Sequence, residues 1–218
     1  MFKEYRYSTL LQFDELKIGE NENEIADVYL RYSNKILLAQ VKSGSIYDDQ
    51  KFGGDLESLY RGNRSKFYEN YGLKQLVKSI VDIEKYMYKT DVKYPKGHQK
   101  KIFPVLIVNE KVLQTPLMPQ SFNYRFQELL NDYTFDKCNI YPLTIIHISD
   151  LELIQRSISS NPKQIWKLLE HATKDKDSNK PFYIIVNQDV ASEHPQEIVN
   201  FYRSLFDEIH GSMEQSPL

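Results

Sequence analysis

Residues 24–43, EIADVYLRYSNKILLAQVKS, decide the fold of this chain. Two apolar runs, 25–32 and 35–43, flank the pair Ser33-Asn34, and both runs are rich in aliphatic and aromatic side chains that favour extended structure. Ser and Asn are common in turns because their short polar side chains hydrogen-bond to nearby backbone. The stretch therefore predicts a β-hairpin with its turn at Ser33-Asn34.

The pairing register of this hairpin follows from the positions of its apolar residues. With the turn centred on Ser33-Asn34, position 28 faces 39 and position 30 faces 37. A one-residue slip would move every apolar side chain to the opposite face, so a consistent apolar face supports this register. That face is expected to be core and consists of Ala26, Val28, Leu30, Leu37, Ala39 and Val41.

Three polar side chains are expected to meet on the other face of the hairpin. Asp27 lies opposite Gln40, and Lys42 follows Gln40 by two residues, which places both on the same face. Carboxylate and amide oxygens suit Mg²⁺, with Mn²⁺ as an alternative, and an ammonium group can orient water and stabilise charge on a phosphate. The alternative is a simple cross-strand ion pair of Asp27 and Lys42, worth about 0.2–1 kcal/mol, with Gln40 on an exposed surface.

Downstream of the hairpin, helical and strand patterns alternate, which is typical of a mixed α/β domain. Apolar residues at helical spacing predict a helix over 73–86, and Pro104 favours an edge position, or the strand's start, for the run 102–108. We divide the chain into a core, 1–110, and an α/β extension, 111–218, packed on the same domain. The remaining predicted elements are helices over 120–132, 162–173 and 194–209, a helix capped by Ser149-Asp150, and strands over 140–149 and 182–186.

The string Asp27…Ala39-Gln40-Val41-Lys42-Ser43 resembles the core of the PD-(D/E)xK, or restriction-endonuclease-like, nuclease superfamily, in the QxK variant of Mrr-type nucleases. The resemblance covers roughly residues 15–108. It implies a central mixed sheet flanked by helices and a metal-dependent nuclease of bacterial or phage nucleic-acid metabolism or defence. It also implies the site residues: Asp27, Gln40 and the carbonyl of Val41 hold the metal, Lys42 positions the attacking water, and Gln75 supports the site.

The chain departs from the superfamily pattern in two ways. The superfamily core usually begins with a helix that carries a Glu, and fewer than 25 residues precede the hairpin here. Glu20 is the first candidate for this carboxylate, ahead of Glu15 and Glu24. Because Gln40 is uncharged, the site would bind a metal more weakly unless an upstream Glu completes it.

The charge of the chain is unevenly distributed, although its formal net charge is only −2. Residues 51–101 contain 12 Lys and Arg against 6 Asp and Glu, and the segments on either side are acidic. Basic side chains neutralise phosphates and aromatic rings stack on bases, so we expect this segment to bind nucleic acid, DNA foremost, although a solvated lysine-rich loop is the alternative. The residues expected to bind are Arg61, Arg64, Lys66, Lys96, Lys100 and Lys101.

Composition excludes several classes of protein. The single cysteine, Cys138, excludes a disulfide framework and a four-thiolate zinc site. No stretch approaches 18 apolar residues, so we expect no membrane association and a cytoplasmic location. The alternative function is a non-catalytic module of the same fold that binds nucleic acid or a protein partner. A homodimer through the aromatic-rich helix 194–209 is a further expectation.

Overall fold

The strands of this protein form one mixed sheet of six strands and a separate pair in the part of the chain that the structure describes. The computed structural model describes residues 8–12, 17–18, 23–43, 68–69, 71–95, 97–174, 180–190, 200 and 203–204. The sheet has the order β1-β4-β5-β6-β7, and β8 also pairs with β6. Its strands are β1 (Ser8–Gln12), β4 (Val28–Tyr32), β5 (Lys35–Lys42), β6 (Lys100–Val108), β7 (Cys138–Ile140) and β8 (Thr144–His147), and the separate pair is β2 (Lys17–Ile18) with β3 (Asn23–Glu24).

The predicted hairpin and its register are confirmed. Val28 pairs with Ala39 and Leu30 with Leu37 in the antiparallel ladder of β4 and β5. Ser33 adopts a positive φ of 56°, which completes the tight turn at the predicted place. From β5 onward the sheet is parallel, because β6 pairs in parallel with β5 and also with β7 and β8.

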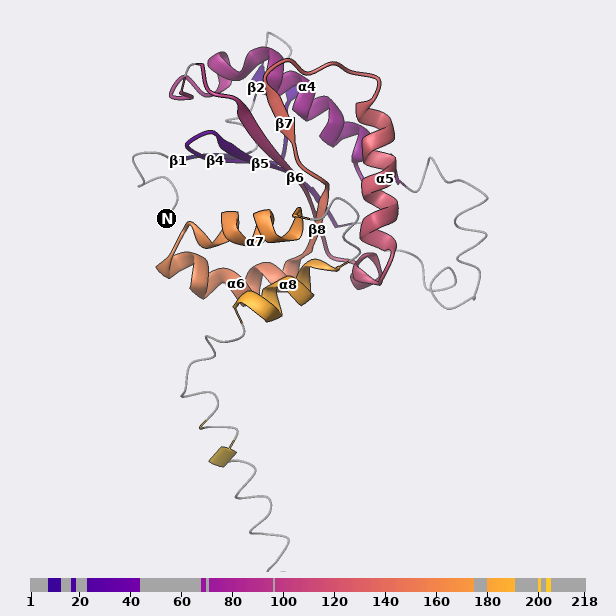
Figure 1. The fold of residues 1–218 in the computed structure, drawn as a ribbon, viewed down its shortest axis with the longest axis vertical. Helices are drawn as coiled ribbons and strands as arrows, with labels where there is room; N and C mark the ends of the chain where they lie inside the picture. The colour runs from indigo at the N-terminus through magenta and orange to yellow at the C-terminus, as the bar shows by residue number, and fades with distance from the viewer. Residues whose placement is uncertain are drawn as a thin grey trace, which may run out of the picture.

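Helices cover both faces of this sheet, as Figure 1 shows. One face packs against α4 (Leu73–Thr90) and α5 (Met118–Leu130), the other against α6 (Ile148–Ser160), α7 (Gln164–Ala172) and α8 (Phe182–Asp189). The predicted α/β class with a central mixed sheet flanked by helices is confirmed. The short helix η3 (Lys111–Gln114) joins β6 to α5.

The hairpin therefore has two core faces, where the sequence predicted one. Leu30, Leu37 and Ala39 pack towards α6–α8, whereas Tyr29 and Leu38 pack towards α4. Strands buried on both faces are usual where crossover helices cover a parallel sheet. The prediction that Val41 belongs to the core was wrong: it is 41% exposed, because β4 begins only at Val28 and leaves the end of β5 uncovered on that side.

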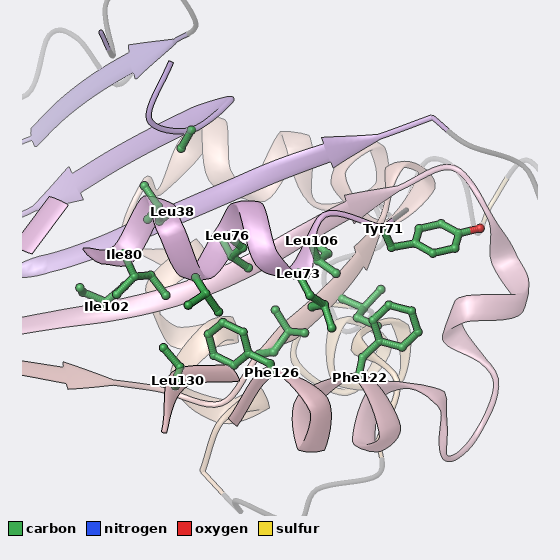
Figure 2. Close-up of a cluster of buried hydrophobic side chains, with 14 of the residues drawn as sticks. Leu38, Tyr71, Leu73, Leu76, Ile80, Ile102, Leu106, Phe122, Phe126 and Leu130 are labelled. Carbon is green, nitrogen blue, oxygen red and sulfur yellow. The ribbon is translucent and has the colours of Figure 1, made fainter. Parts of the chain in front are cut away.

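Helix α4 forms where the sequence predicted a helix, and its buried side chains have the predicted spacing. Figure 2 shows Leu73, Leu76 and Ile80 from α4 packed with side chains from β5, β6 and α5. All three are fully buried. Apolar residues three and four positions apart lie on one side of a helix, so this stripe fixes which face of α4 covers the sheet.

The strand predictions in the second half of the chain were partly wrong. Residues 182–186 belong to α8, because five apolar residues in a row do not distinguish a short strand from a buried helix. The predicted strand 140–149 is split into β7 and β8 by residues 141–143. Helix α6 begins at Ile148, and His147 is its N-cap, with Nδ1 accepting a hydrogen bond from the Ser149 N–H at 3.1 Å.

Pro104 lies in the centre of the sheet, where the sequence predicted an edge or the start of a strand. On the side of β6 away from β5, two short strands pair with it. Residues Lys100 to Ile102 of β6 pair with β7, and residues Val105 to Val108 of β6 pair with β8. Pro104 falls in the gap between them. A residue without an N–H is tolerated there because none of the described strands pairs with Pro104 on that side.

The predicted helix 194–209 lies outside the described residues except for positions 200 and 203–204, which are helical. The predicted homodimer through this helix stays a prediction. Among the described helices, none combines the length and the apolar character needed to cross a lipid bilayer.

Candidate active site

Asp27 lies at the start of the hairpin and reaches across to the end of β5. Its Oδ2 accepts a hydrogen bond from the Val41 N–H at 2.5 Å. Asp27 is half-buried and precedes the first residue of β4. One carboxylate oxygen of Asp27 thus holds the end of β5.

Lys42 meets Gln75, the residue that the resemblance implied as a support of the site. The Lys42 Nζ donates a hydrogen bond to Gln75 Oε1 at 2.5 Å. Lys42 is the last residue of β5, and Gln75 lies in the first turn of α4. The contact places an ammonium group at the carboxyl end of the parallel strands, where α/β proteins commonly bind ligands.

Gln40 is buried and turned towards α4. It is 5% exposed, and its Nε2 donates a hydrogen bond to Ser79 Oγ at 3.3 Å. The Ser79 hydroxyl has one proton, which it donates to the backbone carbonyl of Ile25 or of Gln75. Since Ser79 Oγ then acts as an acceptor, the group of Gln40 that faces it must be the NH₂, and Oε1 is the group available to a cation. Gln40 therefore does not lie on an exposed surface.

The spacing of strand and helix explains why these contacts form together. Lys42 meets Gln75 and Gln40 meets Ser79, so α4 runs antiparallel to β5. Two residues of strand span about 6.6 Å, and four residues of helix rise about 6 Å. The two pairs therefore match in length, and one face of α4 holds both side chains.

Ser79 is a residue of the site that the sequence did not indicate, and its removal has a testable cost. In Ser79→Ala the buried NH₂ of Gln40 loses its acceptor, and we expect the free energy of unfolding to fall by about 1–3 kcal/mol, measured by urea denaturation. Ser159→Ala is the control, because Ser159 Oγ makes the same contact to the carbonyl four residues earlier but is exposed. A loss no larger than that of the control would contradict the role given to Ser79.

Gly72 is a second residue of the site that the sequence did not indicate. It precedes α4 with φ +76° and lies directly against the Lys42 side chain. A glycine before a helix is visible in the sequence, but the side chain that it makes room for is 30 residues away and is known only from the fold.

The predicted phosphate-binding residues Lys100 and Lys101 do not lie at this site. Both are at the beginning of β6, whereas Lys42 pairs with Val108 at its end. Seven or eight residues of strand place these lysines about 25 Å from Val108. Lys100 is also buried, at 7% exposure. The sequence could not show this because it did not give the direction of β6 relative to β5.

Several predicted site residues lie outside the described residues. They are Glu15, Glu20, Arg61, Arg64, Lys66 and Lys96. For Glu24 the backbone is described and the side chain is not. Their roles stay predictions.

Burial keeps the Tyr71 hydroxyl and the Cys138 thiol in their protonated forms. Burial, with a smaller contribution from the charge of Glu110, raises the pKa of Tyr71 to about 12. Burial also raises the pKa of the Cys138 thiol to about 12. A thiol with such a pKa is a poor nucleophile at neutral pH, which agrees with a structural role for Cys138.

The oxygen donors at this strand end suit a hard cation that keeps part of its water shell. Asp27 provides a carboxylate, and Gln40 and Val41 add amide and backbone carbonyl oxygens. Within the described residues, no group of three or more His, Cys, Asp or Glu side chains is placed to hold a metal. Mg²⁺ is often bound by one or two carboxylates together with substrate phosphates and water, so this donor set fits it.

The small subunit of a restriction endonuclease is a weak structural neighbour of this chain. No family model and no curated protein matches the chain. The chain is similar in structure to the small subunit of the heterodimeric restriction endonuclease R.BspD6I, with a TM-score of 0.35 and 10% sequence identity, over 77% of this chain and 70% of that subunit.

Proposed function

We propose that this protein is a metal-dependent nuclease that hydrolyses phosphodiester bonds, with DNA as the substrate to test first. The observation that carries the proposal is the pairing of Lys42 with Gln75 at the strand end where Asp27 binds the Val41 N–H. The Asp27 carboxylate thus lies at the backbone of Val41, and Lys42, the next residue of β5, carries the ammonium group. A carboxylate that can hold a cation, beside an ammonium group that can stabilise charge on a phosphate, is a combination that can promote phosphodiester hydrolysis.

Each side chain has a distinct role in this proposal. Asp27 and the carbonyl oxygens of Gln40 and Val41 would hold Mg²⁺ or Mn²⁺, and Glu20 would add a second carboxylate. Bound there, the cation supplies Lewis-acid stabilisation of the phosphoryl oxygens and a water of lowered pKa. Lys42, held by Gln75, orients the attacking water and offsets the negative charge that grows on the phosphate.

The exposed side of α4 is the surface that suits the nucleic-acid backbone. Its lysines follow one another at intervals of four, seven and four residues, so they lie within about 60° around the helix axis. All four are exposed, and the stripe begins in the turn that carries Gln75. Such a stripe supports phosphate binding in place of Lys100 and Lys101. It consists of Lys74, which pairs with Glu69, and of Lys78, Lys85 and Lys89.

The proposal is tested by incubating the full chain with plasmid and linear DNA, with and without Mg²⁺ or Mn²⁺. We expect cleavage only with the metal, and a loss of at least about 100-fold in Asp27→Asn. Asn retains an oxygen that accepts the Val41 N–H, so this variant removes the charge and keeps the contact. Asp132→Asn, at an exposed position after α5, is the control and should cleave as the wild type does.

Three outcomes of this assay are informative. Cleavage that does not require a divalent metal, or that survives in Asp27→Asn, would contradict the proposal. DNA binding without cleavage would favour the alternative, a non-catalytic module of the same fold. DNA binding is measured separately from cleavage, by fluorescence anisotropy with labelled DNA. An affinity that falls with salt concentration in that measurement reports phosphate contacts.

A further inference from the structure

Gly72 and Lys42 lie so close that no other residue fits at position 72 without moving the lysine. A Cβ built on Gly72 would be 2.5 Å from Lys42 Cε, 3.3 Å from Lys42 Nζ and 3.1 Å from Gln75 Oε1. We propose that Gly72 is a positioning residue, whose missing side chain is the space in which Lys42 lies to reach Gln75. This inference rests on the proposed function, because it concerns the same lysine.

The surroundings of Gly72 decide which partner would give way. Its N–H donates to the Glu69 carbonyl at 2.8 Å, and its own carbonyl accepts from the Leu76 N–H at 2.9 Å. Its neighbours Tyr71 and Leu73 are buried in the core drawn in Figure 2. The backbone of Gly72 is thus fixed on both sides.

The far end of the lysine is the movable partner in this contact. Cε and Nζ are the last atoms of a flexible side chain at the end of β5, and Nζ donates a hydrogen bond to Gln75 Oε1. A Cβ at position 72 would therefore displace the Lys42 ammonium from Gln75 and leave the fold in place. We therefore expect a small change in the free energy of unfolding and a large change in the position of the Lys42 ammonium group.

The chain contains a matched control for this substitution. Gly97 has φ +81°, nearly the same as Gly72, and a Cβ there would have no heavy atom within 4 Å. Gly97→Ala therefore introduces the strain of a side chain at positive φ without any contact. The difference between Gly72→Ala and Gly97→Ala isolates the contact with Lys42.

The experiment measures the lysine directly, without relying on catalysis. The full-length wild type, Gly72→Ala and Gly97→Ala are treated briefly with an amine-acylating reagent, and acylation of Lys42 is quantified by peptide mass spectrometry relative to exposed Lys167. We expect Lys42 to react several-fold faster in Gly72→Ala only, because its ammonium no longer donates to Gln75. Both variants should unfold at similar urea concentrations. If Gly72→Ala does not fold, Gly72→Asn replaces it, because Asn adopts positive φ more readily and still carries a Cβ.

Kinetic constants give the second measurement. In DNA cleavage we expect kcat to fall at least 10-fold in Gly72→Ala with KM close to wild type, and neither constant to change in Gly97→Ala. Equal acylation of Lys42 in all three proteins would overturn the positioning role of Gly72. Faster acylation in Gly72→Ala, in a protein that cleaves no DNA even as wild type, would support the positioning role and overturn the proposed nuclease function.

Discussion

Lys42→Ala is expected to abolish metal-dependent DNA cleavage, with a loss of two to three orders of magnitude in kcat. The side chain supplies the ammonium group that donates to Gln75, and removing one group that stabilises transition-state charge typically costs about 10²–10³ in rate. Steady-state cleavage gives kcat, and single-turnover reactions check that the loss lies in the chemical step and not in product release.

The control for this prediction is a lysine with no role in the site. Lys167 is exposed on α7, on the opposite side of the sheet, and Lys167→Ala should cleave at the wild-type rate. Because Lys42 is at the end of a strand and only partly buried, Lys42→Ala should retain the wild-type circular dichroism spectrum. A folded Lys42→Ala protein that still cleaves DNA would refute the proposed mechanism.

Asp91→Ala is expected to be the most destabilising single substitution among those considered. The Asp91 carboxylate is buried and forms an ion pair with Arg31, which is 4% exposed. It also accepts hydrogen bonds from the Tyr29 hydroxyl at 3.0 Å and the Lys93 N–H at 3.1 Å. Removing the carboxylate breaks a buried ion pair, and breaking such a pair by deleting one member typically costs about 3–5 kcal/mol. In a domain of this size the midpoint of thermal unfolding should fall by about 10 °C.

The stability control is an ion pair at the surface. Arg125 and Glu128 form an exposed pair three residues apart on α5, at 2.9 Å. Glu128→Ala should change the free energy of unfolding by less than about 1 kcal/mol, because exposed pairs are screened by water and salt. Equal losses in Asp91→Ala and Glu128→Ala, measured by calorimetry, would show that burial of the Arg31 pair does not control its contribution.

Contacts at both ends of α4 join this helix to the hairpin. Gln75 holds Lys42 at the first turn of the helix, and Asp91, just after its last residue, holds Arg31 of β4. The helix is thereby fixed to the hairpin at both ends. This explains how a partly buried lysine at a strand end is held in a defined place.

Much of the candidate site could be predicted from local sequence. The positions of Asp27, Gln40 and Lys42 follow from the side-chain alternation of a strand and from a turn at Ser33-Asn34, both of which depend on residues close in the chain. The helix over 73–86 follows from apolar spacing in the same way. The short run 182–186 could not be assigned correctly, because its period is not readable in five apolar residues.

The sequence by itself determined the hairpin and its register, and it predicted that Asp27, Gln40 and Lys42 share one face, because strand geometry converts spacing along the chain directly into position. Only the tertiary structure decided that Ser79 orients Gln40, that Gly72 makes room for Lys42 and that Arg31 pairs with Asp91. These partners are separated by 30 to 60 residues. Their contacts depend on the direction and height at which α4 crosses the sheet, and that placement is set by the packing of the whole core.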